Sequence, residues 1–357
     1  MPSRAYLYVG CYTNESPVGI GVYDASDPRG RLEQQSEVDD IEHASFLAIH
    51  PNGRVLYAVS ETVSPDGGGV VAYRVDPADG SLTRIDRVSS RGSAPCYVSL
   101  DADGRHLYVA NYVSGSITVL MLELDGRFGD VVATSQHSGS GPTSRQEGPH
   151  PHCVLPGLGG ESVYVADLGT DRVLRYTHLA GPGGRTFASE DGLALAAGSG
   201  PRHLAFHPEQ PVAFLVCELD STIATVGVDP RTGRLTELGV QSTLPADFDG
   251  FSIGADVRVH PNGCHVYVSN RGHDSLAVFG FSGAGEPLDL LGHVPSGGRT
   301  PRNFALHPSG TALLVANQDS NSLIPFTIDP STGMPTQLEA SYGASEPVCL
   351  TFLEVVR

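Results

Sequence analysis

The segment Ala255–Asn270, ADVRVHPNGCHVYVSN, contains the pattern that decides the fold. An apolar alternation leads into His-Pro-x-Gly, and an aliphatic and aromatic run then ends in a small polar residue. An alternation of period two predicts a β-strand, and Pro with Gly between two such runs predicts a tight turn. The segment is therefore expected to form a β-hairpin.

The same pattern recurs along the chain. The other copies are Ser45–Ser60 (SFLAIHPNGRVLYAVS), Cys96–Asn111 (CYVSLDADGRHLYVAN), His150–Asp167 (HPHCVLPGLGGESVYVAD), Arg202–Glu218 (RHLAFHPEQPVAFLVCE) and Arg302–Asn317 (RNFALHPSGTALLVAN). A polar turn and a third strand follow each copy, and Asp-Pro-x-x-Gly turns at 76–80, 229–233 and 329–333 lead to a fourth strand. Equivalent positions recur every 47 to 54 residues. A repeated four-stranded unit of this length is typical of one blade of a β-propeller.

Six complete units are visible, and a seventh is divided between the two ends of the chain. Residues 347–352 (PVCLTF) are expected to supply its innermost strand, and residues 6–11 (YLYVGC) and 19–23 the next two. A blade shared by both termini closes the ring and removes exposed sheet edges. The sequence therefore predicts an all-β protein, a seven-bladed β-propeller with four antiparallel strands per blade that occupies residues 1–357 as a single domain.

Composition limits the partners of the protein. The net charge is −18, and all 22 basic residues are Arg. Such an acidic chain is not expected to bind nucleic acid or an anionic membrane, and without Lys it cannot form a Schiff base. No apolar run is long enough to span a bilayer, the N-terminus has no signal-peptide core, and the six Cys are scattered. We therefore expect a cytoplasmic protein with buried, free thiols.

The His of each His-Pro turn recurs at one repeat position: His50, His207, His260 and His307. Recurrence in several blades is what a structural residue shows. These four imidazoles are therefore expected to form turn hydrogen bonds and to take no part in catalysis.

The two innermost strands of a blade form a hairpin, so the first strand begins where the second ends, at one rim of the ring. Polar residues gather at these positions or beside them: Asn111, Arg145, His150, His152, Arg202, Glu218, Asn270, Arg271 and Arg302. Ionisable side chains that converge at a propeller mouth predict a binding or catalytic site.

Four of these residues form the most specific cluster. His150 and Arg202 are read as equivalent positions of adjacent blades, Glu218 ends the strand that pairs with the one begun by Arg202, and Arg271 leaves the next blade. A carboxylate between guanidiniums, near an imidazole, can orient an anion and move a proton. The alternative interpretation is an ion-pair network that only stiffens the rim.

Four segments in the same register resemble the lactonase family of seven-bladed propellers. They are RQEGPHPH at 145–152, GPRHLAFHP at 200–208, CEL at 217–219 and SNRGHDS at 269–275. The family includes the propeller-type 6-phosphogluconolactonase and the fungal carboxy-cis,cis-muconate cyclase, and the resemblance covers nearly the whole chain. In the cyclase branch a His, two Arg and a Glu are implicated in the site. Carried over, they fall on His150, Arg202, Glu218 and Arg271, with His152 as an alternative to His150.

The resemblance is closer to the phosphogluconolactonase branch, which implies hydrolysis of 6-phosphogluconolactone, an anionic small molecule. Arg202 and Arg271, with Arg302 in reserve, would hold the phosphate and polarise the lactone carbonyl. Either His150 or Glu218 would deprotonate the attacking water. The remaining predicted contacts to substrate are Asn111, Arg145, His152 and Asn270.

No nucleophilic Ser is expected, because the chain lacks a G-x-S-x-G elbow. No cofactor is expected, and no metal, because nothing near His150-x-His152 completes a ligand shell. Two other functions stay open: a muconate-type lactonizing cycloisomerase and a non-catalytic interaction propeller. The absence of Trp and of any WD dipeptide argues against the interaction propeller.

Overall fold

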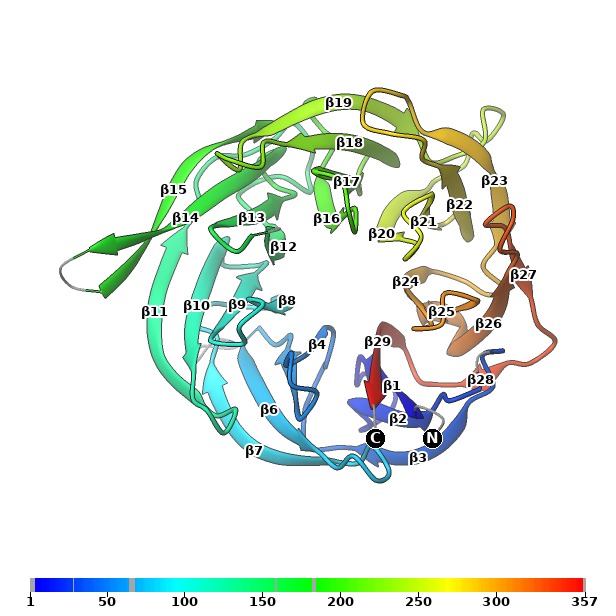
Figure 1. Cartoon of the computed structure of the whole chain (residues 1–357), viewed down its shortest axis with the longest axis horizontal. Helices are drawn as coiled ribbons and strands as arrows, with labels where there is room; N and C mark the ends of the chain where they lie inside the picture. The colour runs from blue at the N-terminus through cyan, green and yellow to red at the C-terminus, as the bar shows by residue number, and fades with distance from the viewer. Residues whose placement is uncertain (1–3, 28, 64–67, 158, 182–183, 356–357) are drawn as a thin grey trace.

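The structure of the chain is a computed structural model, which describes residues 4–27, 29–63, 68–157, 159–181 and 184–355. The described residues form seven antiparallel sheets arranged as blades around one axis, as Figure 1 shows. The prediction of a seven-bladed β-propeller is confirmed. None of the described residues belongs to a helix that is long and apolar enough to cross a bilayer.

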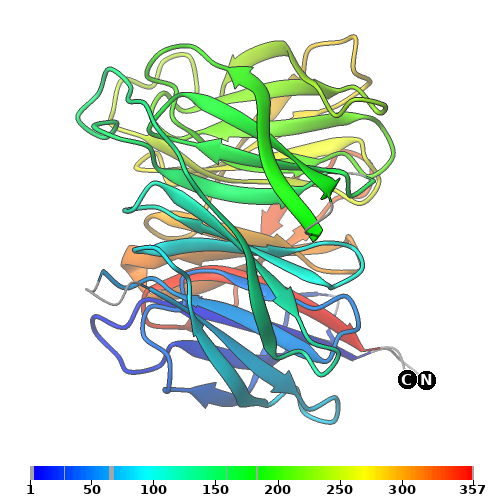
Figure 2. The ribbon, with the colours of Figure 1, turned by 90° about the vertical axis from the view of Figure 1, so that its left-hand side faces the viewer.

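Blades 1 to 3 follow one another from residue 47. Blade 1 contains β4 (Leu47–Ile49), β5 (Val55–Ser60), β6 (Gly69–Val75) and β7 (Leu82–Ser89). Blade 2 contains β8 (Pro95–Leu100), β9 (His106–Asn111), β10 (Ser116–Leu122) and β11 (Phe128–Gln136). Blade 3 contains β12 (Pro151–Pro156), β13 (Ser162–Asp167), β14 (Arg172–Gly181) and β15 (Gly184–Ala194). The β14–β15 hairpin extends beyond the outline of the ring (green in Figures 1 and 2).

Blades 4 to 6 repeat this order. Blade 4 contains β16 (Pro201–Phe206), β17 (Val212–Cys217), β18 (Thr222–Val228) and β19 (Leu235–Ser242). Blade 5 contains β20 (Ile253–Val259), β21 (His265–Arg271), β22 (Ser275–Gly280) and β23 (Asp289–Pro295). Blade 6 contains β24 (Pro301–Leu306), β25 (Ala312–Asn317), the 3₁₀ helix η1 (Gln318–Ser320), β26 (Ser322–Ile328), and β27 (Pro335–Gln337) and β28 (Tyr342–Gly343), which both pair with β26.

Blade 7 joins the two ends of the chain, as predicted. Its strands in order from the axis are β29 (Pro347–Val355), β1 (Arg4–Cys11), β2 (Ile20–Asp24) and β3 (Glu33–Val38). Arg4 pairs with Val355, so the ends of the described chain lie side by side, as in Figures 1 and 2. Because the innermost strand comes from one terminus and its neighbour from the other, the ring is closed by backbone hydrogen bonds.

The core lies between neighbouring blades. Every residue of β5, β9, β13, β17 and β25, the second strands of five blades, is buried, as expected for strands covered by a sheet on each face. A Tyr in four of the second strands also donates a hydrogen bond to a turn carbonyl of the next blade. The pairs are Tyr8–Gly80 (3.0 Å), Tyr57–Gly126 (2.9 Å), Tyr164–Gly233 (2.7 Å) and Tyr267–Gly333 (2.8 Å). These bonds satisfy buried hydroxyls and fix the spacing of the blades.

The His-Pro histidines have the structural role that recurrence predicts, and they also link blades. In each ring Nδ1 accepts a main-chain N–H two residues further on, so Nε2 carries the proton. Nε2 donates to a carbonyl of the following blade in the pairs His50–Gly104 (3.0 Å), His207–Gly263 (3.0 Å), His260–Gly310 (2.7 Å) and His307–Ala25 (2.9 Å).

The prediction of buried thiols holds for five of the six cysteines. Cys264, in the turn before β21, is exposed. All six are free.

Candidate functional site

The predicted cluster comes together at the rim where innermost strands begin and second strands end, here called the site rim. Glu218 follows β17 directly and is 2% exposed. Its Oε1 accepts a hydrogen bond from Arg145 Nη2 (2.9 Å), and its Oε2 accepts from Arg202 Nε (2.9 Å) and Arg271 Nη2 (2.8 Å). The three guanidiniums come from blades 4 and 5 and from the loop before blade 3, so one carboxylate holds three separate parts of the chain.

The electrostatics of this cluster define what Glu218 can do. Burial alone would raise the pKa of Glu218, but the guanidiniums of Arg271, Arg202 and Arg145 lower it to about 2. Burial lowers the pKa of Arg271 to about 10, which still leaves it protonated at neutral pH. An ionised carboxylate with both oxygens occupied and so low a pKa is a weak proton acceptor.

Arg202 is held by hydrogen bonds, but one nitrogen of its guanidinium has no partner among the described residues. It is almost fully buried, and its Nη1 donates to the carbonyl of Ala255 and contacts His203. With Nε bound to Glu218, its Nη2 has no hydrogen bond to any described residue. Burial and the neighbouring Arg302 lower the pKa of Arg202. Arg271 also has an unused donor, since its buried Nε–H has no hydrogen-bond partner among the described residues.

His150, the residue before β12, lies beside this cluster. Its ring is stacked on Tyr112, with centroids 4.4 Å apart, and its Nδ1 donates to the Tyr112 carbonyl (2.9 Å). A carbonyl only accepts, so in the neutral ring Nε2 carries the lone pair. Nε2 lies 3.6 Å from the exposed carboxylate of Glu147. Tyr112 connects His150 to the Glu218 cluster. Its hydroxyl accepts a hydrogen bond (3.2 Å) from Arg145 Nη2, the nitrogen that also binds Glu218.

His152 is closer to the axis of the ring. It is buried, and its ring makes edge contacts with the rings of Tyr112 (5.5 Å) and His203 (5.3 Å). Burial, Arg202 and His203 hold the pKa of His152 well below its usual value, so the ring is neutral. His150 and His152 therefore both lie at the site, in different surroundings.

Arg302, at the start of β24, has a different kind of partner from the other three arginines. Its Nη2 donates to the Tyr12 hydroxyl (2.9 Å), which donates to Glu61 Oε2 (3.0 Å). Tyr12 and Glu61 outweigh the effect of burial and raise the pKa of Arg302. Among the described residues no carboxylate lies within ion-pair distance of its guanidinium, so Arg302 is the arginine of this rim whose charge is not already paired.

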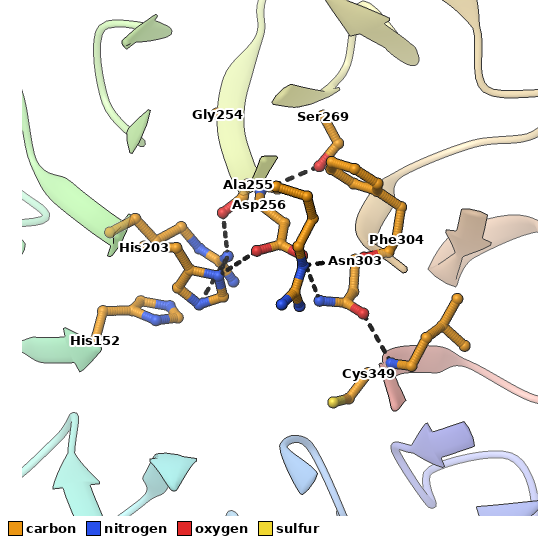
Figure 3. Close-up of polar contacts among 12 residues, drawn as sticks. His152, His203, Gly254, Ala255, Asp256, Ser269, Asn303, Phe304 and Cys349 are labelled. Atoms are coloured by element: carbon orange, nitrogen blue, oxygen red, sulfur yellow. Dashed lines mark hydrogen bonds and ion pairs between the residues drawn. The ribbon is translucent and has the colours of Figure 1, made fainter. Parts of the chain in front are cut away.

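A second charged group, which the sequence did not predict, is centred on Asp256 (Figure 3) and reaches Arg202 through His203. Asp256 Oδ1 accepts from His203 Nδ1 (2.8 Å), and its Oδ2 accepts from Arg258 Nε (3.0 Å) and Asn303 Nδ2 (2.7 Å). Burial would raise the pKa of Asp256, but Arg258 and His203 lower it to about 2. Burial and, after it, the charge of Arg202 lower the pKa of His203 to about 3, so its imidazole is neutral. Its Nδ1 donates to Asp256, which leaves Nε2 to accept from Arg202 Nη1.

The register of the strands corrects one step of the sequence interpretation. Each of β12 and β16 begins with a Pro that pairs with the last residue of the second strand, and the register then shifts by one residue. Because Pro151 and Pro201 hold the same place in their blades, His152, and not His150, is the position equivalent to Arg202. Likewise Glu218 lies one residue past the strand end, at the position that Tyr112 and Arg271 occupy in their blades.

The same register explains why Asn111 and Asn270 do not join the cluster. Both are fully buried inside the ring of blades. Asn111 Nδ2 donates to the carbonyl of Ser90 (3.3 Å), and Asn270 Nδ2 donates to that of Thr243 (2.8 Å). Side chains alternate along a strand, so these two face the blade, and the next residue faces the rim. Their predicted contact with substrate is therefore replaced by a structural role.

Tyr12 and Glu61 occupy the position of Glu218 in blades 7 and 1, and neither was predicted. Counting one residue past each second strand would have found both. His203, Asp256 and Asn303 also had a signal in the sequence, since each is a polar residue that accompanies an Arg within an innermost strand whose other residues are apolar.

The site rim contrasts with the opposite end of the ring. A cavity of about 1050 Å³ opens there, lined by residues that include His50, Arg54, Arg74, Leu124 and Leu353. Ionisable side chains line it as well, but in the described part of the chain Arg54 and Arg74 form no ion pair with a carboxylate, unlike the guanidiniums that Glu218 holds at the site rim, and the candidate site is therefore not placed there. In the described part of the chain, no three His, Cys, Asp or Glu residues are grouped so that they could hold a metal ion.

Comparison with known proteins agrees with this architecture. The family model described as "Lactonase, 7-bladed beta-propeller" matches residues 6–352. A Bacillus subtilis protein named 6-phosphogluconolactonase is 34% identical over 98% of both chains, and a Formosa agariphila protein of the same name is 32% identical over 92% of this chain and 93% of its own. The solved structure of a Pseudomonas aeruginosa periplasmic gluconolactonase superposes with a TM-score of 0.92 at 32% identity, covering 98% of this chain and 99% of its own. With nearly its whole length matched in sequence and in structure, the chain belongs to the lactonase family of seven-bladed β-propellers.

Proposed function

We propose that this protein hydrolyses the ester bond of 6-phosphogluconolactone. The observation that carries the proposal is the convergence of Arg145, Arg202, Arg271 and Arg302 at one rim of a protein whose net charge is −18. One carboxylate, Glu218, accepts from three of them, so an excess of positive charge remains. A phosphorylated lactone supplies the complementary charge. The names of the Bacillus and Formosa relatives support the same substrate.

In the proposed reaction a water attacks the lactone carbonyl, and the bond between the carbonyl carbon and the ring oxygen breaks. His150 is the base that we assign, because its Nε2 lone pair is left free by the bond from Nδ1 to Tyr112. The proton that His150 takes from water is returned to the ring oxygen as it leaves. Glu218 is the weaker candidate, since its pKa of about 2 gives it little affinity for a proton.

Arg202 and Arg271 are suited to the oxyanion that forms on the carbonyl oxygen. Glu218 fixes both guanidiniums before substrate arrives, and donors fixed in advance need no reorganisation in the transition state. The unused donors at Arg202 Nη2 and Arg271 Nε support this role. The Nε–H of Arg271 is also buried, and a buried N–H without a partner costs free energy that an anionic oxygen would recover.

Arg302 is assigned to the phosphate. Its charge is unpaired in the described residues, and its partner is the Tyr12 hydroxyl, which can rotate its hydrogen to suit a ligand. Arg145 and His152 complete the proposed contacts with substrate. We keep the cytoplasm as the proposed location, because free thiols are typical of a reducing compartment, and cell fractionation would test it.

A pH-stat assay tests the proposal. Freshly generated 6-phosphogluconolactone and unphosphorylated gluconolactone are supplied in parallel, and spontaneous hydrolysis is subtracted. We expect a large acceleration with the phosphorylated lactone and a higher KM for the unphosphorylated one. A carboxymuconate supplied in a third assay tests for ring closure by a muconate-type cycloisomerase. Acceleration of neither hydrolysis would refute the proposal.

A further inference from the structure

One repeat position in the ring is occupied differently in the blade that carries His150. In three blades an Asn ends the second strand or, in blade 5, stands one residue before its end, and the partner of this Asn is the residue that follows the outermost strand of the preceding blade. The pairs are Asn111–Ser90, Asn270–Thr243 and Asn317–Ser296. In blade 3 the same two positions are Asp167 and His137. The partner residues are equivalent, since each donates its main-chain N–H to the residue before a third strand.

The hydrogen bonds at this position are reversed in blade 3. Each Asn donates its amide to the main-chain carbonyl of its partner, and the Oδ1 atoms of Asn111 and Asn317 have no partner among the described residues. Asp167 has no donor of its own. Its Oδ2 accepts from His137 Nδ1 (2.5 Å), and its Oδ1 accepts two main-chain N–H groups, those of His150 (2.8 Å) and Gly169 (3.0 Å).

These bonds attach the segment 148–150 to the end of β13. The N–H of Leu168 also donates to the carbonyl of His150 (3.0 Å). A Cβ atom on Gly169 would lie 1.9 Å from the carbonyl oxygen of Gly148, so the two segments are in direct contact. Asp167 therefore fixes the main chain of His150, while Tyr112 fixes its ring.

Burying the side chains of His137 and Asp167 costs free energy, which indicates that the pair has a function. The side chains of His137 and Asp167 are 1% and 0% exposed, and a buried carboxylate is unfavourable unless it is fully hydrogen-bonded. Three other blades join their neighbours at this position with uncharged groups. The carboxylate–imidazole pair occurs in the blade whose innermost strand is preceded by His150.

We infer that Asp167, held by His137, is a positioning residue that places the imidazole of His150 for proton transfer. This inference rests on the proposed function, in which His150 takes a proton from water. The carboxylate acts through the main chain of His150 and does not contact the substrate.

The double variant D167N/H137S tests the inference, because it installs in blade 3 the Asn–Ser pair of blades 2 and 6. We expect a folded protein with an unchanged KM and a kcat lowered by about 10- to 100-fold, the cost of a small displacement of a reacting group. Asp167→Asn alone is the second variant, should the double variant not fold, and the same direction is expected. Asn317→Ala is the matched control, which removes the equivalent inter-blade bond of blade 6 and should lower stability but not kcat.

Repeating the change in a His150→Ala background separates positioning from a general structural effect. If Asp167 acts through His150, D167N/H137S has no further effect on kcat there. An equal fractional loss of kcat in both backgrounds would overturn the inference, as would a wild-type kcat in D167N/H137S when His150→Ala is impaired.

A second measurement is independent of turnover and keeps the test separate from the proposed function. Imidazole ¹⁵N spectra, with the His150 signals assigned by their loss in His150→Ala, report which ring nitrogen carries the proton. We expect the proton on Nδ1 in the wild type and a mixture of tautomers in D167N/H137S. If His150→Ala keeps full turnover, the proposed base is wrong, and the spectra still decide the positioning: an unchanged His150 tautomer in the variant refutes it.

Discussion

Replacement of Glu218 by Gln should make the protein less stable in a way that depends on pH. The pKa of this carboxyl is lowered from 4.5 to about 2 in the folded chain. Each unit is worth about 1.4 kcal/mol, so the ionised carboxylate contributes about 3 kcal/mol to the free energy of unfolding. Because the folded pKa is the lower one, this contribution is complete above pH 4.5 and is lost as the pH falls towards 2. Glu218→Gln should lack the contribution at every pH.

Urea unfolding at several pH values between 7 and 3 measures this difference. The chain has no Trp, so circular dichroism or Tyr fluorescence is the signal. The two proteins should differ by about 3 kcal/mol at pH 7 and approach one another in acid. Glu237→Gln, which changes an exposed carboxylate on β19, is the matched control and should behave as the wild type. A difference that stays constant down to pH 3 would show that the charge of Glu218 is not the source of the effect.

Three further changes test other parts of the argument. His150→Ala should lower kcat by about 10²–10⁴-fold, as expected for a lost general base, and leave stability nearly unchanged; steady-state kinetics together with a melting curve would check both. Arg302→Gln should raise KM for the phosphorylated lactone by roughly 10- to 100-fold and leave the unphosphorylated lactone little affected. Equal effects on the two substrates would mean that Arg302 does not bind the phosphate. Deletion of residues 1–12 removes β1 and with it ring closure, so cooperative unfolding should be abolished. A truncated protein with an unchanged melting curve would contradict the role of blade 7.

The fold was predictable because the sequence pattern of one blade recurs along the chain. Each repeat carries the same hairpin pattern, and an error at one strand end does not alter the number of blades. The division of blade 7 between the termini followed from the count alone, since six complete units left strands at both ends. The links between blades were not visible in the sequence, because a Tyr hydroxyl or a His Nε2 meets a turn carbonyl of the next blade only in three dimensions.

Much of the site was predictable, and several of the errors are shifts of one or two residues along a strand. A shift of one residue along a strand moves a side chain to the other face of the sheet, and for this reason Asn111 and Asn270 face the blade and not the rim. The hairpin turn of blade 3 contains no His-Pro: Gly157 occupies the place of His207, since each donates its main-chain N–H to the first residue of the second strand. Without that marker His150 was aligned where His152 belongs. Tyr12 was missed because its partner Arg302 lies 290 residues away.

The shared seventh blade has a consequence for synthesis on the ribosome. β1 is made long before β29, its inner partner, because the strands of six blades lie between them in the chain. Throughout translation β1 therefore presents an unpaired edge, which is a template for association with other nascent chains. Domains made of local units can fold as they emerge, but this ring cannot close until β29 has left the ribosome. Ring closure therefore waits for β29, and a chain that stops before Pro347 leaves an open arc that chaperones and proteases would recognise.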